Sequence, residues 1–180
     1  EVTLIDKNDP GSMTSYGHAC TFADYACVPI NSTNLFKDVP SMLMRSDGPL
    51  SIDFFYMIKN INWALRFLRN SSRNNVNNIS EALANILKSA SVSYDEIFSD
   101  VEVSNYIRNE EAIYLYKNEI AYLKAKRANA IRKKNGVEIK ILSQNDVLDL
   151  EPNLARVFHN GQLFIGSRHT SNPSAISKKI

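Results

Sequence analysis

The sequence predicts a mixed α/β fold, and three patterns support this expectation. Residues 2–6 form an apolar run that ends in a carboxylate, as a short buried strand does. Residues 51–70 repeat apolar side chains at three- and four-residue steps, which is the period of an amphipathic helix. Residues 137–141 alternate strictly between apolar and charged side chains, as in a half-buried strand. Strands and helices are therefore expected along the same chain.

The segment between residues 49 and 106 is expected to be helical. A first helix over 51–70 follows the turn-forming Asp47-Gly48-Pro49 and has one apolar stripe. The stripe contains Phe54, Met57, Ile58, Ile61, Leu65 and Leu68. A second helix over 75–89 is expected to bury Val76, Ile79, Leu83, Ile86 and Leu87. Residues 91–105 are expected to continue as helix and then pass into a loop.

The second half of the chain alternates between strand and helix signals. β-Rich residues 112–116 precede a helix over 118–134, which Asn135-Gly136 ends. That helix is expected to turn Ile120, Leu123, Ala128 and Ile131 inwards. Ser143, with Asp146 three residues later, caps a short helix that runs to Leu150. We expect residues 111–117, 137–141 and 162–165 to share one mixed sheet, separate from strand 2–6.

Composition excludes several classes of function. The 180 residues are 44% hydrophobic, which is enough for a real core, and the net charge of +2 gives no general polyanion-binding signature. The cations between Lys124 and Lys134 are interpreted as a solvated helix face. No apolar run approaches the roughly 20 residues of a membrane span. Cys20 and Cys27 stand apart, so neither a metal site nor a disulfide framework is expected.

Residues 6–20 contain the strongest candidates for ligand binding. Asp6 ends the expected strand, where a carboxylate can accept hydrogen bonds from the hydroxyls of an adenosine ribose. The alternative for Asp6 is an ordinary surface acid. Thr14 and Ser15 offer hydroxyls and, at an expected helix start, free backbone amides that suit a pyrophosphate. Plain helix capping is the alternative for these two residues.

The segment from Thr14 to Ala19 resembles a loop of FAD-dependent amine oxidoreductases of the D-amino acid dehydrogenase and glycine oxidase type. Further matches follow in the same order and rough spacing, at Gly48-Pro49-Leu50, Trp63, Leu68-Arg69-Asn70, Leu150-Glu151-Pro152 and Leu154. The resemblance covers essentially the whole chain. It implies an incomplete FAD-binding, Rossmann-like domain with a helical insertion and part of a mixed-sheet substrate domain.

The resemblance also implies how the chain divides. Residues 1–48 correspond to a remnant of the FAD-binding domain, 49–106 to the helical segment, 107–170 to part of the substrate domain, and 171–180 to the return to the FAD domain. In the family a Gly-x-Gly-x-x-Gly turn and its helix come immediately before the strand that corresponds to residues 2–6, and the sequence has no such glycine pattern. The chain is therefore expected to be an internal piece of a longer flavoprotein.

The resemblance assigns a contact with the cofactor to eight residues of this loop. Asp6 and Lys7 would lie at the adenosine end, Thr14 and Ser15 at the pyrophosphate, and Gly17, His18, Ala19 and Cys20 against the isoalloxazine ring. Relatives commonly have Asn and Gly where this chain has His18 and Cys20. No catalytic residue is expected, because a hydride leaves a neutral amine without a protein base. General-base catalysis by His18 is the alternative.

The resulting hypothesis is a bacterial flavoprotein of amino acid catabolism that oxidises a D-amino acid to an imine, which hydrolyses to a 2-oxo acid and ammonia. FAD is the implied cofactor, and a respiratory quinone or another acceptor takes the electrons. No nucleic acid partner is expected, and the location is the cytoplasm or, peripherally, the inner membrane. Two alternatives stay open: oxidation of glycine, sarcosine or proline, and a non-catalytic helical interaction domain.

Overall fold

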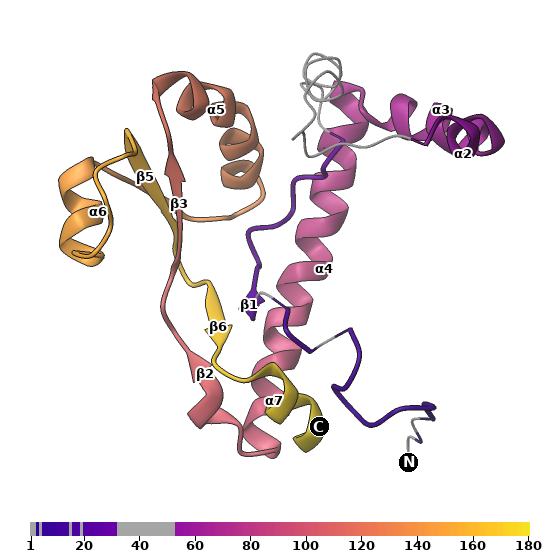
Figure 1. Ribbon diagram of the computed structural model, residues 1–180, viewed down its shortest axis with the longest axis vertical. Helices are drawn as coiled ribbons and strands as arrows, with labels where there is room; N and C mark the ends of the chain where they lie inside the picture. Colours follow the sequence, from indigo (N-terminus) through magenta and orange to yellow (C-terminus); the bar gives the residue numbers. More distant parts are fainter. Residues whose placement is uncertain (1–2, 4, 15, 19, 32–52) are drawn as a thin grey trace.

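The computed structural model describes residues 3, 5–14, 16–18, 20–31 and 53–180. The long helix α4 (Arg73–Asp100) forms its spine, and the other elements are arranged along it (Figure 1). A sheet flanked by α5 and α6 lies to one side of this helix. A smaller sheet and α7 lie near its C-terminal end, whereas α2 and α3 extend from its N-terminal end.

The larger sheet confirms that residues 111–117, 137–141 and 162–165 belong together. Its strands are β3 (Ala112–Tyr116), β4 (Ile139–Leu142) and β5 (Asn160–Phe164), in the order β3-β5-β4. Both strand pairs are antiparallel, so the expectation of a mixed sheet was wrong. The reason is that β5 inserts between β3 and β4, which point the same way but never become neighbours.

Helices α5 (Glu119–Lys134) and α6 (Gln144–Leu150) pack beside this sheet. Their ends confirm the capping signals that the sequence showed. Ser143 and Asp146 form a reciprocal capping box at the start of α6. Gly136 follows α5 with a φ of +87°, a conformation that glycine adopts without steric cost. Leu142 and Leu163 of the sheet, Val147 of α6 and Phe158 form one buried cluster.

The buried face of α5 agrees with the expected one only near the C-terminal end of the helix. Ile131 is buried as expected, whereas Ile120 and Leu123 in the N-terminal half are exposed. Asn129, which was not expected to face inwards, is also buried and exchanges side-chain hydrogen bonds with Gln162 of β5, at 2.6 and 3.3 Å. This pair gives the buried amide of Asn129 the partner that it needs.

The smaller sheet joins three distant parts of the chain. It contains β1 (Thr21–Phe22), β6 (Arg168–Thr170) and β2 (Ile107–Arg108), in the antiparallel order β1-β6-β2. Beside it, the end of α4, η1 (Ser104–Tyr106) and α7 (Pro173–Lys179) surround a core of Phe98, Val103 and Ile176. The N-terminal loop therefore lies beside the C-terminal segment, an arrangement that sequence patterns did not indicate.

The helical segment also departs from expectation. In place of one helix over 51–70 there are α2 (Phe54–Lys59) and α3 (Ile61–Asn70), divided at Asn60. The Asn60 side chain donates to the carbonyl of Tyr56 at 2.9 Å and so competes with the backbone pattern of the helix. Asp53 caps α2, and residues 51 and 52 lie outside the described residues. Conversely, the expected helix over 75–89 and its continuation form one unbroken α4.

The expected strand over 2–6 is not formed among the described residues. Thr3, Ile5 and Asp6 lie outside any strand, and 90% of Ile5 is exposed, while Val2 and Leu4 are outside the described residues. Within the described part of the chain no strand pairs with this segment. Asp6 instead accepts a hydrogen bond from the backbone of Asn8, which turns the chain. The Rossmann-like unit expected here is not confirmed.

Candidate functional site

Residues 6–14 and helix α7 enclose a cavity of about 570 Å³. From the N-terminal loop it is lined by Asp6, Asn8, Asp9, Pro10, Gly11, Met13 and Thr14. From the C-terminal segment it is lined by Ser177 and Ile180. Residues near both ends of the chain therefore line the same cavity.

Two local features hold the loop in this shape. An Asp6 carboxylate oxygen accepts from the amide of Asn8 at 3.0 Å, and the carbonyl of Asp9 accepts from the amide of Ser12 at 3.1 Å. Gly11 has a φ of +71°, and a Cβ there would stand 2.8 Å from the Cβ of Ser177. Only glycine fits so close an approach to α7 without a shift of the chain.

The structure brings two of the predicted cofactor-binding residues together. Asp6 and Thr14 both line the cavity, whereas Lys7 is exposed and does not line it. Ser15 lies outside the described residues. Thr14, Tyr16 and Gly17 lie in turns, so among the described residues no helix begins where one was expected at residues 14–15. The described residues therefore offer no helix dipole here to attract a pyrophosphate.

The predicted flavin-contacting segment follows the cavity and has a strained backbone. Gly17 and His18 are exposed, Cys20 is half-buried, and Ala19 lies outside the described residues. Gly17 has a φ of +73° and Cys20 a φ of +64°. A left-handed conformation is costly for a residue with a Cβ, which explains why glycine suits the Cys20 position in relatives.

Three hydrogen bonds hold Cys20 in this conformation. Its amide donates to Nδ1 of His18 at 2.7 Å, and its Sγ donates to the carbonyl of His18 at 3.1 Å. Its own carbonyl accepts from the amide of Thr170 at 2.7 Å, immediately before β1 pairs with β6. The Nδ1 atom of His18 is thereby an acceptor, so it cannot at the same time remove a proton from a substrate.

The chemistry of the cavity suits one part of FAD better than another. Carboxylates at Asp6 and Asp9 can accept hydrogen bonds from ribose hydroxyls, and the Thr14 hydroxyl can donate or accept. Two carboxylates in one small space repel the negative charges of a pyrophosphate. These residues therefore fit the adenosine ribose of FAD and not its phosphates.

Asp9, Gly11 and Ser177 were not predicted to be part of the site. The turn-forming run Asp9-Pro10-Gly11 was a visible signal for a sharp bend. Nothing local in the sequence indicates that Ser177, more than 160 residues later, packs against that bend. Among the described residues, no group of three or more His, Cys, Asp or Glu side chains could hold a metal ion. In the same part of the chain, no helix is long and apolar enough to cross a bilayer.

Comparison with known sequences finds two informative relatives. The chain is 26% identical over 162 residues to a D-amino-acid oxidase of Bradyrhizobium diazoefficiens, covering 85% of this chain and 37% of that protein. It is 25% identical over 72 residues to a D-amino acid dehydrogenase of Helicobacter pylori, covering 40% of this chain and 18% of that protein. No family model matches the chain. The expected resemblance to amino acid oxidoreductases is confirmed.

Comparison with solved structures finds three matches of low similarity. Glycine oxidase from Geobacillus kaustophilus matches with 16% identity and a TM-score of 0.46, over 54% of this chain and 28% of that one. L-proline dehydrogenase from P. horikoshii matches with 15% identity and a TM-score of 0.47, over 55% and 26%. An L-α-glycerophosphate oxidase from Mycoplasma pneumoniae with FAD bound matches with 21% identity and a TM-score of 0.36, over 41% and 20%. The matches span 37% of the length of the D-amino-acid oxidase and 18% of the length of the D-amino acid dehydrogenase.

Proposed function

We propose that this chain provides part of a flavoprotein that oxidatively deaminates D-amino acids. The observation that carries the proposal is the likeness of 162 residues to a D-amino-acid oxidase, together with a cavity in which Asp6 and Thr14 meet. FAD, when bound, supplies the redox chemistry by accepting the hydride of the substrate Cα. The amine becomes an imine, and water then releases a 2-oxo acid and ammonia.

In this proposal the described residues bind and position the cofactor and perform no proton transfer. Asp6 holds the ribose hydroxyls and Thr14 adds a neutral donor beside them. Gly17, His18 and Cys20 form a rigid segment at the flavin ring, because the left-handed turn and the bond to Thr170 restrict the backbone. Lys7, Ser15 and Ala19 complete the set of proposed cofactor contacts.

The electron acceptor and the location are part of the same proposal. Electrons pass to a respiratory quinone or another acceptor, and the protein acts in the cytoplasm or peripherally at the inner membrane. Oxidation of glycine, sarcosine or proline is the alternative reaction. A panel of D-amino acids, glycine, sarcosine and L-proline, assayed with an artificial acceptor and with oxygen, distinguishes these activities in the complete protein.

The cofactor assignment is tested by Asp6→Ala in the complete protein. Loss of a charge-assisted hydrogen bond is expected to weaken FAD binding by about 1–3 kcal/mol, or roughly five- to 150-fold. Asp149→Ala provides the matched control, because Asp149 is an exposed carboxylate on α6 outside the cavity. Equal flavin retention by both variants in equilibrium dialysis would remove Asp6 from the site.

A further inference from the structure

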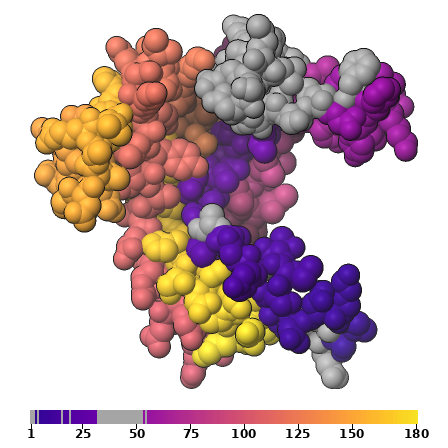
Figure 2. Space-filling model, viewed as in Figure 1, coloured from indigo at the N-terminus to yellow at the C-terminus, as the bar shows by residue number. Residues whose placement is uncertain are grey.

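The helix pair α2–α3 (Phe54–Asn70) presents an apolar surface that the described residues do not cover. No residue of α3 is buried. Figure 2 shows the pair standing out from the rest of the molecule, and Figure 1 shows that it continues from the N-terminal end of α4. Exposed side chains on it include Phe55, Tyr56, Ile58, Ile61, Trp63, Leu65 and Leu68, and 45–84% of each is accessible to solvent. So many large apolar groups in one place exceed the scattered exposure of an ordinary surface.

The large aliphatic residues of α3 lie on one face, and Arg69 lies at one border of that face. At 100° per residue, Ile61, Leu65 and Leu68 fall within one narrow arc. Arg69 falls beside Leu65 and Arg66 falls beyond it, on the side that also holds the asparagines. Trp63 lies apart from this arc and stacks on Phe67, with ring centroids 5.2 Å apart. An apolar face with arginines at its edge is the arrangement of a helix that lies in a membrane interface.

The charge of this region has one sign. From residue 54 to residue 80 the chain contains Lys59, Arg66, Arg69 and Arg73, and it contains no aspartate or glutamate. The whole chain, by comparison, carries 21 basic and 19 acidic residues. A surface that is both apolar and cationic is complementary to anionic phospholipid, whose interface offers apolar chains beneath negative headgroups.

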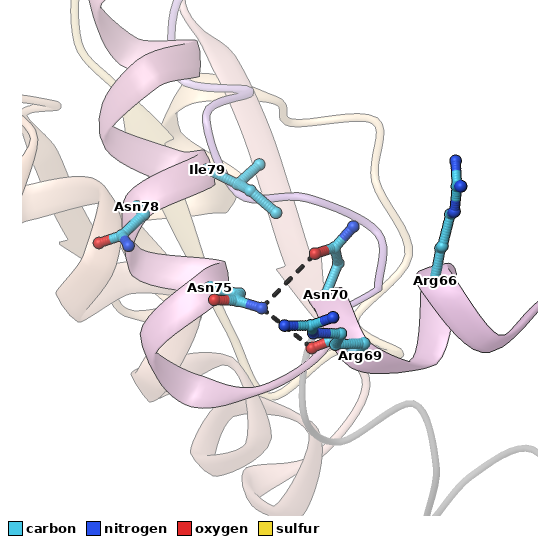
Figure 3. A pocket seen from close by; sticks show the side chains of 6 residues that line it. All are labelled: Arg66, Arg69, Asn70, Asn75, Asn78 and Ile79. Atoms are coloured by element: carbon cyan, nitrogen blue, oxygen red, sulfur yellow. Dashed lines mark hydrogen bonds between the residues drawn. The ribbon is translucent and has the colours of Figure 1, made fainter. Parts of the chain in front are cut away.

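A polar pocket adjoins the apolar face at the junction of α3 and α4. It has a volume of about 390 Å³ and is lined by Arg66, Arg69, Asn70, Asn75, Asn78 and Ile79. Figure 3 shows the Arg66 side chain extending from α3, while Arg69 lies beside Asn70 and Asn75. The Asn75 amide donates to the carbonyl of Arg69 at 3.1 Å, which ties the two helices together. Guanidinium and amide donors with no lining carboxylate suit the phosphate of a headgroup.

We infer that α2–α3 is a docking surface for an anionic phospholipid bilayer. The apolar face enters the interface, and Arg66 and Arg69 contact headgroup phosphates. At about 1.5 Å per residue both helices are too short to span a bilayer, so they lie in its plane. The inference rests on the peripheral membrane location in the proposed function and assigns that location to one surface of the chain. It does not depend on the flavin chemistry, so the vesicle experiments can fail while FAD binding and oxidation of amino acids are still observed, and the reverse.

Co-sedimentation with vesicles measures docking more directly than tryptophan emission does, because the single tryptophan, Trp63, lies on the side of α3 away from the apolar arc. The 180-residue chain is mixed with vesicles of phosphatidylcholine alone or of phosphatidylcholine with phosphatidylglycerol. Co-sedimentation is expected with the anionic vesicles only, and it should weaken at high salt. Inorganic phosphate at constant ionic strength is expected to leave the binding unchanged. Release of the chain by phosphate would mean a soluble anion site and would overturn the bilayer assignment.

Substitutions test the contributions of the charged and the apolar side chains of this surface separately. Arg66→Gln with Arg69→Gln should lower the partition coefficient about thirtyfold, since each cation near an anionic surface contributes roughly fivefold. Lys133→Gln with Lys134→Gln removes the same charge from exposed positions on α5 and should change it less than twofold. Leu65→Asn should lower it about tenfold through lost apolar burial.

Three results would contradict the inference. They are no binding by the wild-type chain while its circular dichroism shows a folded protein, equal loss in both charge variants, and a concentration-dependent dimer that forms without lipid and that Leu65→Asn abolishes. The last result would assign the surface to a second copy of the chain.

Discussion

At the scale of single residues, Cys20 shows how the loop before β1 is held. A φ of +64° places its Cβ close to the following carbonyl, and three hydrogen bonds keep it there. A strained conformation that neighbouring contacts enforce is often found at a ligand-binding segment. The strain here lies in the segment that we propose contacts the flavin.

We expect Cys20→Gly to raise the free energy of unfolding by about 1 kcal/mol relative to Cys20→Ala, because only glycine removes the steric cost of this φ. Cys20→Ala is the matched control, since it also loses the thiol hydrogen bond but keeps a Cβ. Urea denaturation of the two variants measures the difference. A glycine variant less stable than the alanine variant would show that the conformation is not strained.

The raised pKa of Tyr25 makes the free energy of unfolding depend on pH in the alkaline range. Burial, and then a hydrogen bond with Tyr114, raises the pKa of Tyr25 from 10.0 to about 12. Between these values the unfolded chain loses this proton and the folded chain keeps it, so stability falls as the pH rises. We expect a loss of about 1–2 kcal/mol across this range. Urea denaturation along the range tests it, and Tyr25→Phe should make the curve flatter.

At the scale of elements, the packing of β5 against α6 depends on Gly161. A Cβ at this buried position would stand 2.7 Å from Cγ2 of Val147 and 3.3 Å from Cδ2 of Leu115. Because α6 is fixed by its capping box, it has little freedom to move away from the strand.

Gly161→Ala is therefore expected to lower the free energy of unfolding by about 1–3 kcal/mol. Val147→Ala, which removes the clashing methyl group, should be destabilising by itself and should relieve the glycine variant. A double-mutant cycle by urea denaturation measures this coupling. Additive effects of the two substitutions would mean that β5 and α6 separate without cost.

The contact between α5 and β5 rests on polar groups. Asn129 and Gln162 exchange hydrogen bonds, Nη1 of Arg132 donates to Asn129 at 3.0 Å, and Nε of Arg132 donates to the carbonyl of Tyr25 at 3.2 Å. The Arg132 guanidinium also lies over the ring of Phe164, 5.2 Å from its centroid. This network joins the N-terminal segment to the larger sheet.

Gln162→Leu should cost about 1–3 kcal/mol, because Asn129 would then keep a buried amide group without its partner. The double variant Gln162→Leu with Asn129→Leu leaves no such group and should recover part of the loss. Thermal unfolding of the two variants, compared with the parent chain, gives the answer. No recovery in the double variant would show that the pair acts through shape and not through hydrogen bonding.

At the scale of the whole molecule, the two ends of the chain are held together by β1, β6 and α7, which positions the cavity around Asp6. In the proposed function this cavity receives only the ribose end of FAD. The purified 180-residue chain is therefore expected to bind FAD weakly and to show no flavin absorbance. A yellow preparation with a bound-flavin spectrum would mean that residues outside this cavity hold the phosphates.

In the complete protein, His18→Asn should keep the turnover number within about tenfold, a barrier change of about 1.4 kcal/mol or less. The reason is that Nδ1 of His18 already accepts a hydrogen bond from Cys20, which asparagine can also accept. Steady-state kinetics with a D-amino acid and an artificial acceptor measure the effect. A thousandfold loss at full flavin occupancy would make His18 the general base.

The sequence by itself determined the elements whose signals are local. The capping box at Ser143, the glycine after α5 and the alternation over residues 137–141 each depend on neighbours within a few positions. The same holds for the expectation that three separate segments would share one sheet, because each showed a strand pattern of its own. The resemblance to amino acid oxidoreductases was also visible in local motifs.

Only the tertiary structure decided what depends on distant partners. Residues 2–6 have a strand sequence, but a strand needs a neighbour for its hydrogen bonds, and none of the described residues provides one. The apolar period of α5 placed Ile131 correctly, but the burial of Asn129 depends on its hydrogen bonds with Gln162 of β5, a residue that is distant in the sequence. Asp6 and Thr14 share a cavity because α7 packs against Gly11, a contact made across almost the whole length of the chain. A periodic pattern shows which face of an element is apolar, and only the fold decides whether that face is covered.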